Sequence, residues 1–252
     1  MAASQPGKID RQPAYILHAR PYRETSLLLE VLTPDHGRLG LVARGARRPR
    51  AELRGLLLPF QPLTLSWFGK NEVRTLHSAD WQGGVRQLSG LPLICGFYLN
   101  ELLMHLLVRE DPHGETWRIY DRAVRGLAAG ENPGALLRRF ELALIGCLGY
   151  APLLTEDEEG AAVQPDRLYV CSPGQAPALD RGFEPRHHQA MVSGATLLAM
   201  AADDFSAELT RREARGLLRL MLEELMGPEA RLTTRELLQS LTLPAEQEPE
   251  PS

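Results

Sequence analysis

Five arginines lie within eleven residues near the start of the chain: Arg44, Arg47, Arg48, Arg50 and Arg54. The planar guanidinium group matches the oxygen atoms of a phosphate, and a loop can present many such groups without crowding. Further basic residues lie on the neighbouring strand-like runs, namely Arg20, Arg23, Arg38, Lys70 and Arg74. The pattern predicts a surface that binds the phosphate backbone of a nucleic acid. A loop whose arginines only keep the chain in solution is the alternative.

The charge of the chain is divided unevenly along its length. Residues 1–80 hold 12 Lys and Arg against 7 Asp and Glu, a net charge of +5, whereas the chain as a whole carries −4. A basic N-terminal third on an acidic body indicates that one part contacts a polyanion while the rest has another role. Aromatic side chains in this third could stack on bases, although several must belong to a core: Tyr15, Tyr22, Phe60, Trp67, Phe68 and Trp81.

The elements that position these residues are predicted to be short strands. Strand-like runs cover 14–18, 26–32, 38–44, 62–67 and 72–77, and a short helix fits 51–57. Five strands with a small helical insert after the third are typical of an OB-fold, a partly open barrel that commonly binds single strands. Other small barrels would also fit this order.

Beyond residue 90 the hydrophobic period changes to that of helices. Helices are predicted over 93–109, 115–129, 134–149, 187–202, 206–226 and 233–241, and a strand over 167–171. The predicted class is therefore α+β, an N-terminal OB-fold β-barrel (residues 1–82) followed by an α-helical domain. Residues 83–150 form its centre, 151–242 complete it without a zinc site, and the Pro- and Glu-rich residues 243–252 are predicted to be disordered.

A second candidate site is the predicted helix over 134–149. Its apolar positions Leu137, Phe140, Leu144 and Leu148 fall on one face, which indicates core packing. Arg138 and Arg139 then lie on the flank, near a helix N-terminus where the dipole disfavours positive charge. In the ordinary interpretation these arginines are simply solvated. In the functional interpretation they bind an external anion or carboxylate.

The sequence gives little support for a metal site, an enzyme or a membrane protein. Three distant cysteines (Cys95, Cys147, Cys171) form no Cys-x-x-Cys pair, and His187 and His188 beside Cys171 do not predict a metal site. No Walker loop, Gly-x-Gly-x-x-Gly, His-Glu-x-x-His or Gly-x-Ser-x-Gly occurs, so no enzyme, cofactor or small-molecule substrate is predicted. The longest apolar segment, 91–108, is interrupted by polar residues, so a membrane partner is not expected. A cytoplasmic location is expected instead.

Several segments resemble the family of the bacterial recombination mediator protein RecO, and they do so in the same order. They are ILHARPYRETSL at 16–27, GR at 37–38, VARGAR at 42–47, LPFQPL at 58–63, YLNELL at 98–103 and LRRFELALIGCLGY at 137–150, with a weaker likeness in TRELL at 234–238. Many relatives also carry four cysteines as a zinc site in the C-terminal half. Residues 151–185 of this chain offer only Cys171, so no zinc role is carried over and this segment should be held by packing alone.

The resemblance implies an N-terminal OB-fold, a helical domain and no enzymatic turnover. It further implies binding of single- and double-stranded DNA, annealing of complementary strands, and contacts with RecR and with the acidic C-terminal tail of single-strand-binding protein, which help RecA to load near the nucleoid. The DNA role would fall on the barrel arginines, and docking of the tail on Arg138 and Arg139. An OB-fold RNA-binding or translation accessory protein, and a pure protein-interaction adaptor, remain alternatives.

Overall fold

The computed structural model describes residues 7–182, 186 and 188–242. The predicted disordered tail, 243–252, lies outside the described residues, as does His187. Among the described residues, no helix combines the length and the apolar character needed to span a bilayer.

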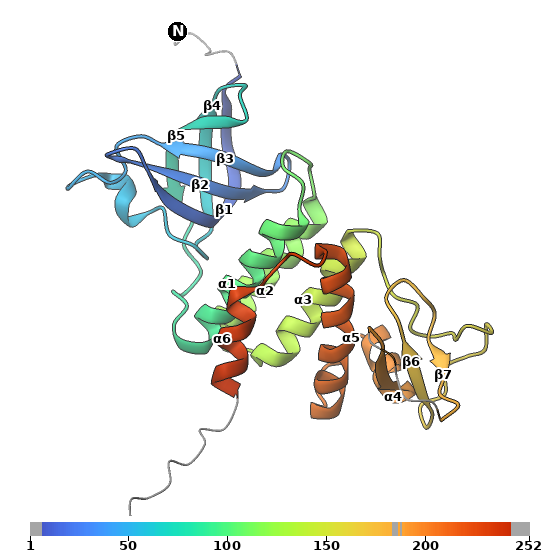
Figure 1. Ribbon diagram of the computed structural model, residues 1–252. Coiled ribbons are helices and arrows are strands. Elements are labelled where there is room, and N and C mark those ends of the chain that lie inside the picture. Colours follow the sequence, from blue (N-terminus) through green and yellow to red (C-terminus); the bar gives the residue numbers. More distant parts are fainter. Residues whose placement is uncertain (1–6, 183–185, 187, 243–252) are drawn as a thin grey trace, which may run out of the picture.

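The N-terminal part is a closed barrel whose strands follow the order β1-β2-β3-β5-β4 (Figure 1). The strands are β1 (Ile9–Tyr22), β2 (Ser26–Thr33), β3 (Gly37–Ala43), β4 (Leu63–Phe68) and β5 (Val73–Trp81). Only β3 and β5 pair in parallel; the other four pairings are antiparallel. This mixed five-stranded barrel confirms the predicted OB-fold. The arginine-rich loop follows β3 and leads into a single 3₁₀ turn, Glu52–Gly55.

Strand β1 is longer than predicted because it serves two cores. Its side chains alternate between the two faces of the strand, as in any β-strand. Ala14 and Ile16 pack inside the barrel, whereas Tyr15 and Leu17 pack with the helices. The strand also pairs with β4 through its first half and with β2 through its second half. A strand buried on both faces loses the simple polar alternation by which its ends could be read from the sequence.

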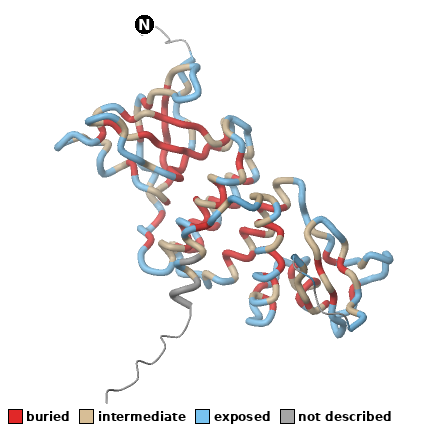
Figure 2. The backbone as a smooth tube through the Cα atoms, viewed as in Figure 1, coloured by how far each residue is buried: buried red, intermediate tan, exposed pale blue. Residues whose placement is uncertain are grey.

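Five helices stand beside the barrel: α1 (Gly90–Leu106), α2 (Gly114–Ala129), α3 (Pro133–Cys147), α5 (Glu208–Met226) and α6 (Thr233–Thr242) (Figure 1). The inward sides of α1, α2, α3 and α5 are buried and form one continuous core (Figure 2). Leu238 of α6 is half-buried and packs against this core. The start of α3 is set by its sequence. Asn132 accepts a hydrogen bond from the main-chain N–H of Ala135, and Pro133 occupies the first turn, where its missing N–H costs nothing.

The predicted helix over 187–202 is wrong in its first half. The chain instead forms strand β8 (Ala190–Ser193), which pairs with β6 (Leu168–Cys171), and only then helix α4 (Gly194–Ala201). The switch occurs at Gly194, where an added Cβ would lie 1.9 Å from the carbonyl oxygen of Gln164. Ser193 caps the new helix by accepting from the N–H of Thr196. Strand pairing therefore overrides the local helical period.

The segment 151–185 is held by more than packing. Strand β6 is the middle strand of a small sheet, between β7 (Ala178–Leu179) and β8. Tyr169 of β6 is fully buried, and its hydroxyl accepts a hydrogen bond of 2.8 Å from the main-chain N–H of Gln164. The sequence predicts packing alone here, whereas the sheet supplies main-chain hydrogen bonds as well.

Polar contacts join the barrel to the helices. The hydroxyl of Tyr15 donates to Asp121 of α2 at 2.6 Å, and the side-chain amide of Asn100 of α1 donates to the carbonyl of Leu17 at 2.8 Å. Burial and the hydrogen bond to Asp121 raise the pKa of Tyr15. These directed contacts fix the barrel against the helices, because breaking them would leave buried polar groups unpaired.

Candidate nucleic-acid interface

The arginine-rich loop is tied to the turn between β1 and β2. The main-chain N–H of Arg47 donates to the carbonyl of Thr25 at 2.9 Å. Its guanidinium group also reaches the carbonyls of Arg23 and Glu24, at 3.4 and 3.3 Å. The two segments therefore form one surface, although about twenty residues separate them in the sequence.

This surface contains a hollow of about 470 Å³, here called the barrel hollow. Four arginines line it: Arg23, Arg44, Arg48 and Arg74. Its remaining wall includes the hydroxyl-bearing residues Thr25, Ser26 and Thr75, together with Tyr22. Guanidinium and hydroxyl groups are the donors that phosphate oxygens accept from.

The four arginines are not equally engaged within the chain. Arg74 forms an ion pair of 2.9 Å with Glu110, so part of its charge is balanced. The guanidinium carbon of Arg23 lies 5.3 Å from the ring centre of Tyr22. The side chains of Arg44 and Arg48 form no hydrogen bond or ion pair within the part of the chain that the structure describes. Both are exposed and available to an external anion.

The other predicted barrel residues surround the hollow or lie away from it. Arg20, Arg47, Arg50, Arg54 and Lys70 are all exposed but do not line it. Arg38 is placed differently from the expectation, because its guanidinium group donates to the carbonyl of Met104 at 2.7 Å, in the last turn of α1. Burial lowers the pKa of Arg38. This arginine satisfies a free helix carbonyl and holds the two parts of the molecule together.

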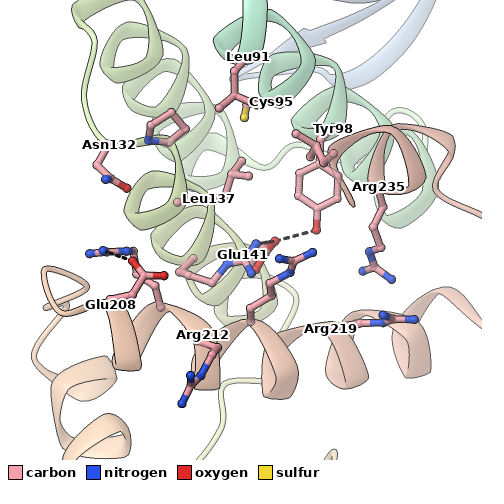
Figure 3. A pocket seen from close by; sticks show the side chains of 16 residues that line it. Leu91, Cys95, Tyr98, Asn132, Leu137, Glu141, Glu208, Arg212, Arg219 and Arg235 are labelled. Carbon is pink, nitrogen blue, oxygen red and sulfur yellow. Dashed lines mark hydrogen bonds and ion pairs between the residues drawn. The ribbon is translucent and has the colours of Figure 1, made fainter. Parts of the chain in front are cut away.

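A second basic surface lies among α1, α3, α5 and α6 (Figure 3), here called the arginine groove. It encloses about 330 Å³ and is lined by six arginines: Arg138, Arg211, Arg212, Arg215, Arg219 and Arg235. Arg219 and Arg235 stand at one end of the groove, and Asn132 and Glu208 at the other. Leu91, Leu137 and Leu238 add apolar surface. The groove therefore offers positive charge and an apolar contact in one place.

Arg138 lies at the floor of this groove and not on a solvated flank. It is 7% exposed and is ion-paired with Glu141, which is 1% exposed and also accepts from the hydroxyl of Tyr98 at 2.7 Å (Figure 3). Burial raises the pKa of Glu141, and the charge of Arg138 opposes the rise. The Nε of Arg138 and the second carboxylate oxygen of Glu141 are buried without a hydrogen-bond partner among the described residues.

Arg139 points elsewhere. Consecutive residues of a helix project about 100° apart, so neighbours in the sequence reach different surfaces. Arg139 forms an ion pair of 2.8 Å with Asp203 and, with Arg122, lines a small hollow of about 90 Å³ between α2 and α3. The structure thus separates the two arginines that the sequence analysis grouped.

The arginines of α5 were missed by the sequence analysis. Arg211, Arg215 and Arg219 are spaced by four, which places them on one face of a helix, so a signal was present. Arg219 is paired with Glu223, and Arg211 with Glu208. By contrast, Arg212 and Arg215 are exposed, and neither side chain has a hydrogen bond or ion pair within the described ranges.

The barrel and the helical body, each with a basic surface, define a class of two-part proteins that join an OB-fold to a helical domain. Residues 9–84 match the family model described as "Recombination protein O N terminal", and residues 89–234 match "Recombination protein O C terminal". The chain belongs to the RecO family, which confirms the resemblance noted in the sequence and gives it a role in DNA repair and recombination.

Relatives match over nearly their whole length. The DNA repair protein RecO of Chromobacterium violaceum is 57% identical over 240 residues, which cover 94% of this chain and 98% of the relative. That of Laribacter hongkongensis is 51% identical over 242 residues, covering 93% and 96%. That of Azoarcus is 47% identical over 243 residues, covering 96% and 99%.

Proposed function

We propose that this chain is a non-enzymatic recombination mediator that binds single- and double-stranded DNA through the barrel hollow and anneals complementary strands. It further engages RecR and the acidic tail of single-strand-binding protein, and so helps RecA to load on coated strands. The observation that carries the proposal is the barrel hollow itself. Arg44 and Arg48 are exposed there without a partner among the described residues, beside Arg23 and Arg74.

The mechanism follows from charge neutralisation. Two complementary strands repel each other through their phosphates, and each bound arginine removes part of that repulsion while releasing condensed counterions. The ring of Tyr22, with Arg23 packed on it, offers a face on which an unpaired base can stack. Contacts of this kind do not depend on base identity, so strands of any sequence can be brought together.

Docking of an acidic tail belongs to the arginine groove. A peptide that carries several carboxylates and an apolar terminal residue would place the carboxylates on Arg212 and Arg215 and the apolar side chain against Leu91 or Leu137. Arg138 contributes from the floor of the groove, where it is already paired with Glu141. Arg139 lies outside the groove and would contribute little to this contact.

The test of the DNA site is the salt dependence of oligonucleotide binding. The double substitution Arg44→Ala with Arg48→Ala should weaken binding of all sequences alike, and should reduce the log–log salt slope by roughly 1–2, because each phosphate contact contributes about 0.7 on single strands. Arg118→Ala with Arg181→Ala removes the same charge from exposed positions outside both surfaces. An unchanged slope in the first variant, or an equal loss in the second, would contradict the proposal.

The test of the groove is binding of a labelled acidic peptide followed by fluorescence anisotropy. Arg212→Glu with Arg215→Glu should abolish binding while leaving the fold intact, because both side chains are exposed. Reversal of Arg138 is the poorer choice, since it would bury two carboxylates together beside Tyr98. Normal peptide affinity in the double variant would count against the docking site.

A further inference from the structure

Helix α6 forms one wall of the arginine groove, and the chain continues directly from it. Arg235 and Leu238 of α6 both line the groove. Arg235 is ion-paired at 2.7 Å with Glu223, near the end of α5, so the start of α6 meets the end of α5. The two helices run in opposite directions (Figure 1). The chain therefore leaves α6 at the end of the groove where Asn132 and the first turn of α5 lie.

The residues that follow have the chemistry that the groove accepts. Residues 243–252 contain Glu246, Glu248 and Glu250 and no lysine or arginine. They begin with the apolar Leu243. Carboxylates beside an apolar side chain are the features proposed above for a docking peptide.

The length of this segment is sufficient. Ten residues in extended conformation span up to about 33 Å. The part of α5 that lines the groove, from Glu208 to Arg219, is about 16 Å long at the rise of an α-helix. The segment can therefore turn back at the end of α6 and cover the groove with residues to spare.

The groove carries a charge that its own residues leave unbalanced. Six arginines line it, and four of them have an acidic partner. Arg138 and Arg211 are paired with Glu141 and Glu208 of the lining. Arg219 and Arg235 share a single carboxylate, that of Glu223. Arg212 and Arg215 make no ion pair within the described residues. The buried Nε of Arg138 also has no hydrogen-bond partner there. A tethered segment with three carboxylates would compensate this excess.

We propose that residues 243–252 occupy the arginine groove of their own chain in the free protein and compete with the acidic tail of the partner. The inference rests on the docking function proposed above for the groove. A short tether gives an effective concentration in the millimolar range. Self-docking with an intrinsic dissociation constant near 0.1 mM would then leave about a tenth of the grooves open, and would weaken partner binding about tenfold.

The experiment compares three proteins: the full chain, the chain lacking residues 243–252, and the full chain with Glu246→Gln, Glu248→Gln and Glu250→Gln. The probe is a fluorescein-labelled peptide of four aspartates followed by a C-terminal phenylalanine. Truncation and neutralisation should each tighten probe binding about tenfold. Equal affinity of all three proteins would overturn the inference. So would tightening by truncation alone, because the glutamates would then contribute nothing.

Two further measurements separate this inference from the docking function. A synthetic peptide of residues 243–252 should displace the probe from the truncated chain, and it should not bind a truncated chain that carries Arg212→Glu and Arg215→Glu. Failure of the probe to bind any of the proteins would overturn the docking function. Tight probe binding that the synthetic peptide cannot displace would overturn self-docking alone.

Discussion

Arginines of the same charge have different roles in this molecule. Arg38 hydrogen-bonds the carbonyl of Met104 and lies between the barrel and α1, whereas Arg44 is exposed at the barrel hollow without a partner among the described residues. In the sequence both are simply basic residues, at the two ends of one predicted strand, 38–44. Only the packing of the barrel against the helices distinguishes Arg38, which stabilises the fold, from Arg44, which is left exposed for the DNA contact proposed above.

Arg38→Ala and Arg44→Ala should therefore change different properties, the first the stability of the fold and the second the salt dependence of DNA binding. Arg38→Ala should lower the free energy of unfolding by about 1–2 kcal/mol, because it leaves a helix carbonyl unpaired in a partly buried place, and it should not change the salt slope of DNA binding. Arg44→Ala should change the slope and leave stability within about 0.5 kcal/mol. Urea unfolding measures the free energy of unfolding, and anisotropy titrations measure the salt slope of DNA binding. The reverse pattern would show that Arg38 contacts DNA.

The buried carboxyl group of Glu141 predicts a pH dependence of stability. Burial raises its pKa above the ordinary 4.5, so the folded chain keeps this proton to a higher pH than the unfolded chain does. The folded state binds more protons in that window, and its contribution to stability therefore falls as the pH rises from 4.5 through the raised pKa.

Urea unfolding between about pH 4 and pH 8 should reveal this slope when the chain is compared with the Glu141→Gln variant, in which the titrating group is gone. The free energy of unfolding of the original chain should fall relative to that of the variant as the pH rises. A constant difference between the two proteins would contradict the assignment.

At the scale of elements, much of the fold could be predicted because local signals agreed with the final pairing. The turn Thr33-Pro34-Asp35-His36-Gly37 separates β2 from β3 where the sequence places it, and the periods of α1, α2 and α3 give their extents within three residues. β8 and α4 could not be separated, since the strand exists only through its pairing with β6. Likewise, the groove needs four helices that no local pattern brings together.

The turn at Gly37 makes a prediction at this scale. Gly37 has a φ of +62°, and an added Cβ would lie 1.9 Å from the carbonyl oxygen of Asp111, in the connection between α1 and α2. Gly37→Ala should lower the free energy of unfolding by about 2–4 kcal/mol through strain and displacement of that connection. Thermal unfolding measures the loss.

Gly174→Ala is the matched control, since its φ is +70° but no atom lies within 4 Å of the added Cβ. It should cost about 1 kcal/mol, from backbone strain alone. Equal losses in the free energy of unfolding of the two variants would show that the barrel does not contact the α1–α2 connection closely at Gly37.

For the whole molecule, the two basic surfaces lie on different parts of one body. The barrel hollow is built from β1, β2, β3 and β5, and the arginine groove from the helices. Hydrogen bonds from Tyr15 and Asn100 fix the two parts against each other. This separation agrees with the proposed division of roles, in which the groove docks the tail of the coating protein and the barrel contacts the strand, and it predicts that the two roles can be removed separately.

The most direct measurement is annealing of two complementary labelled oligonucleotides, bare or coated by single-strand-binding protein. The original chain should accelerate annealing of both. Arg44→Ala with Arg48→Ala should slow annealing in both cases, whereas Arg212→Glu with Arg215→Glu should slow only the annealing of coated strands. Equal behaviour of the two double variants on bare strands, or normal annealing of coated strands by the groove variant, would contradict the division of function between barrel and groove.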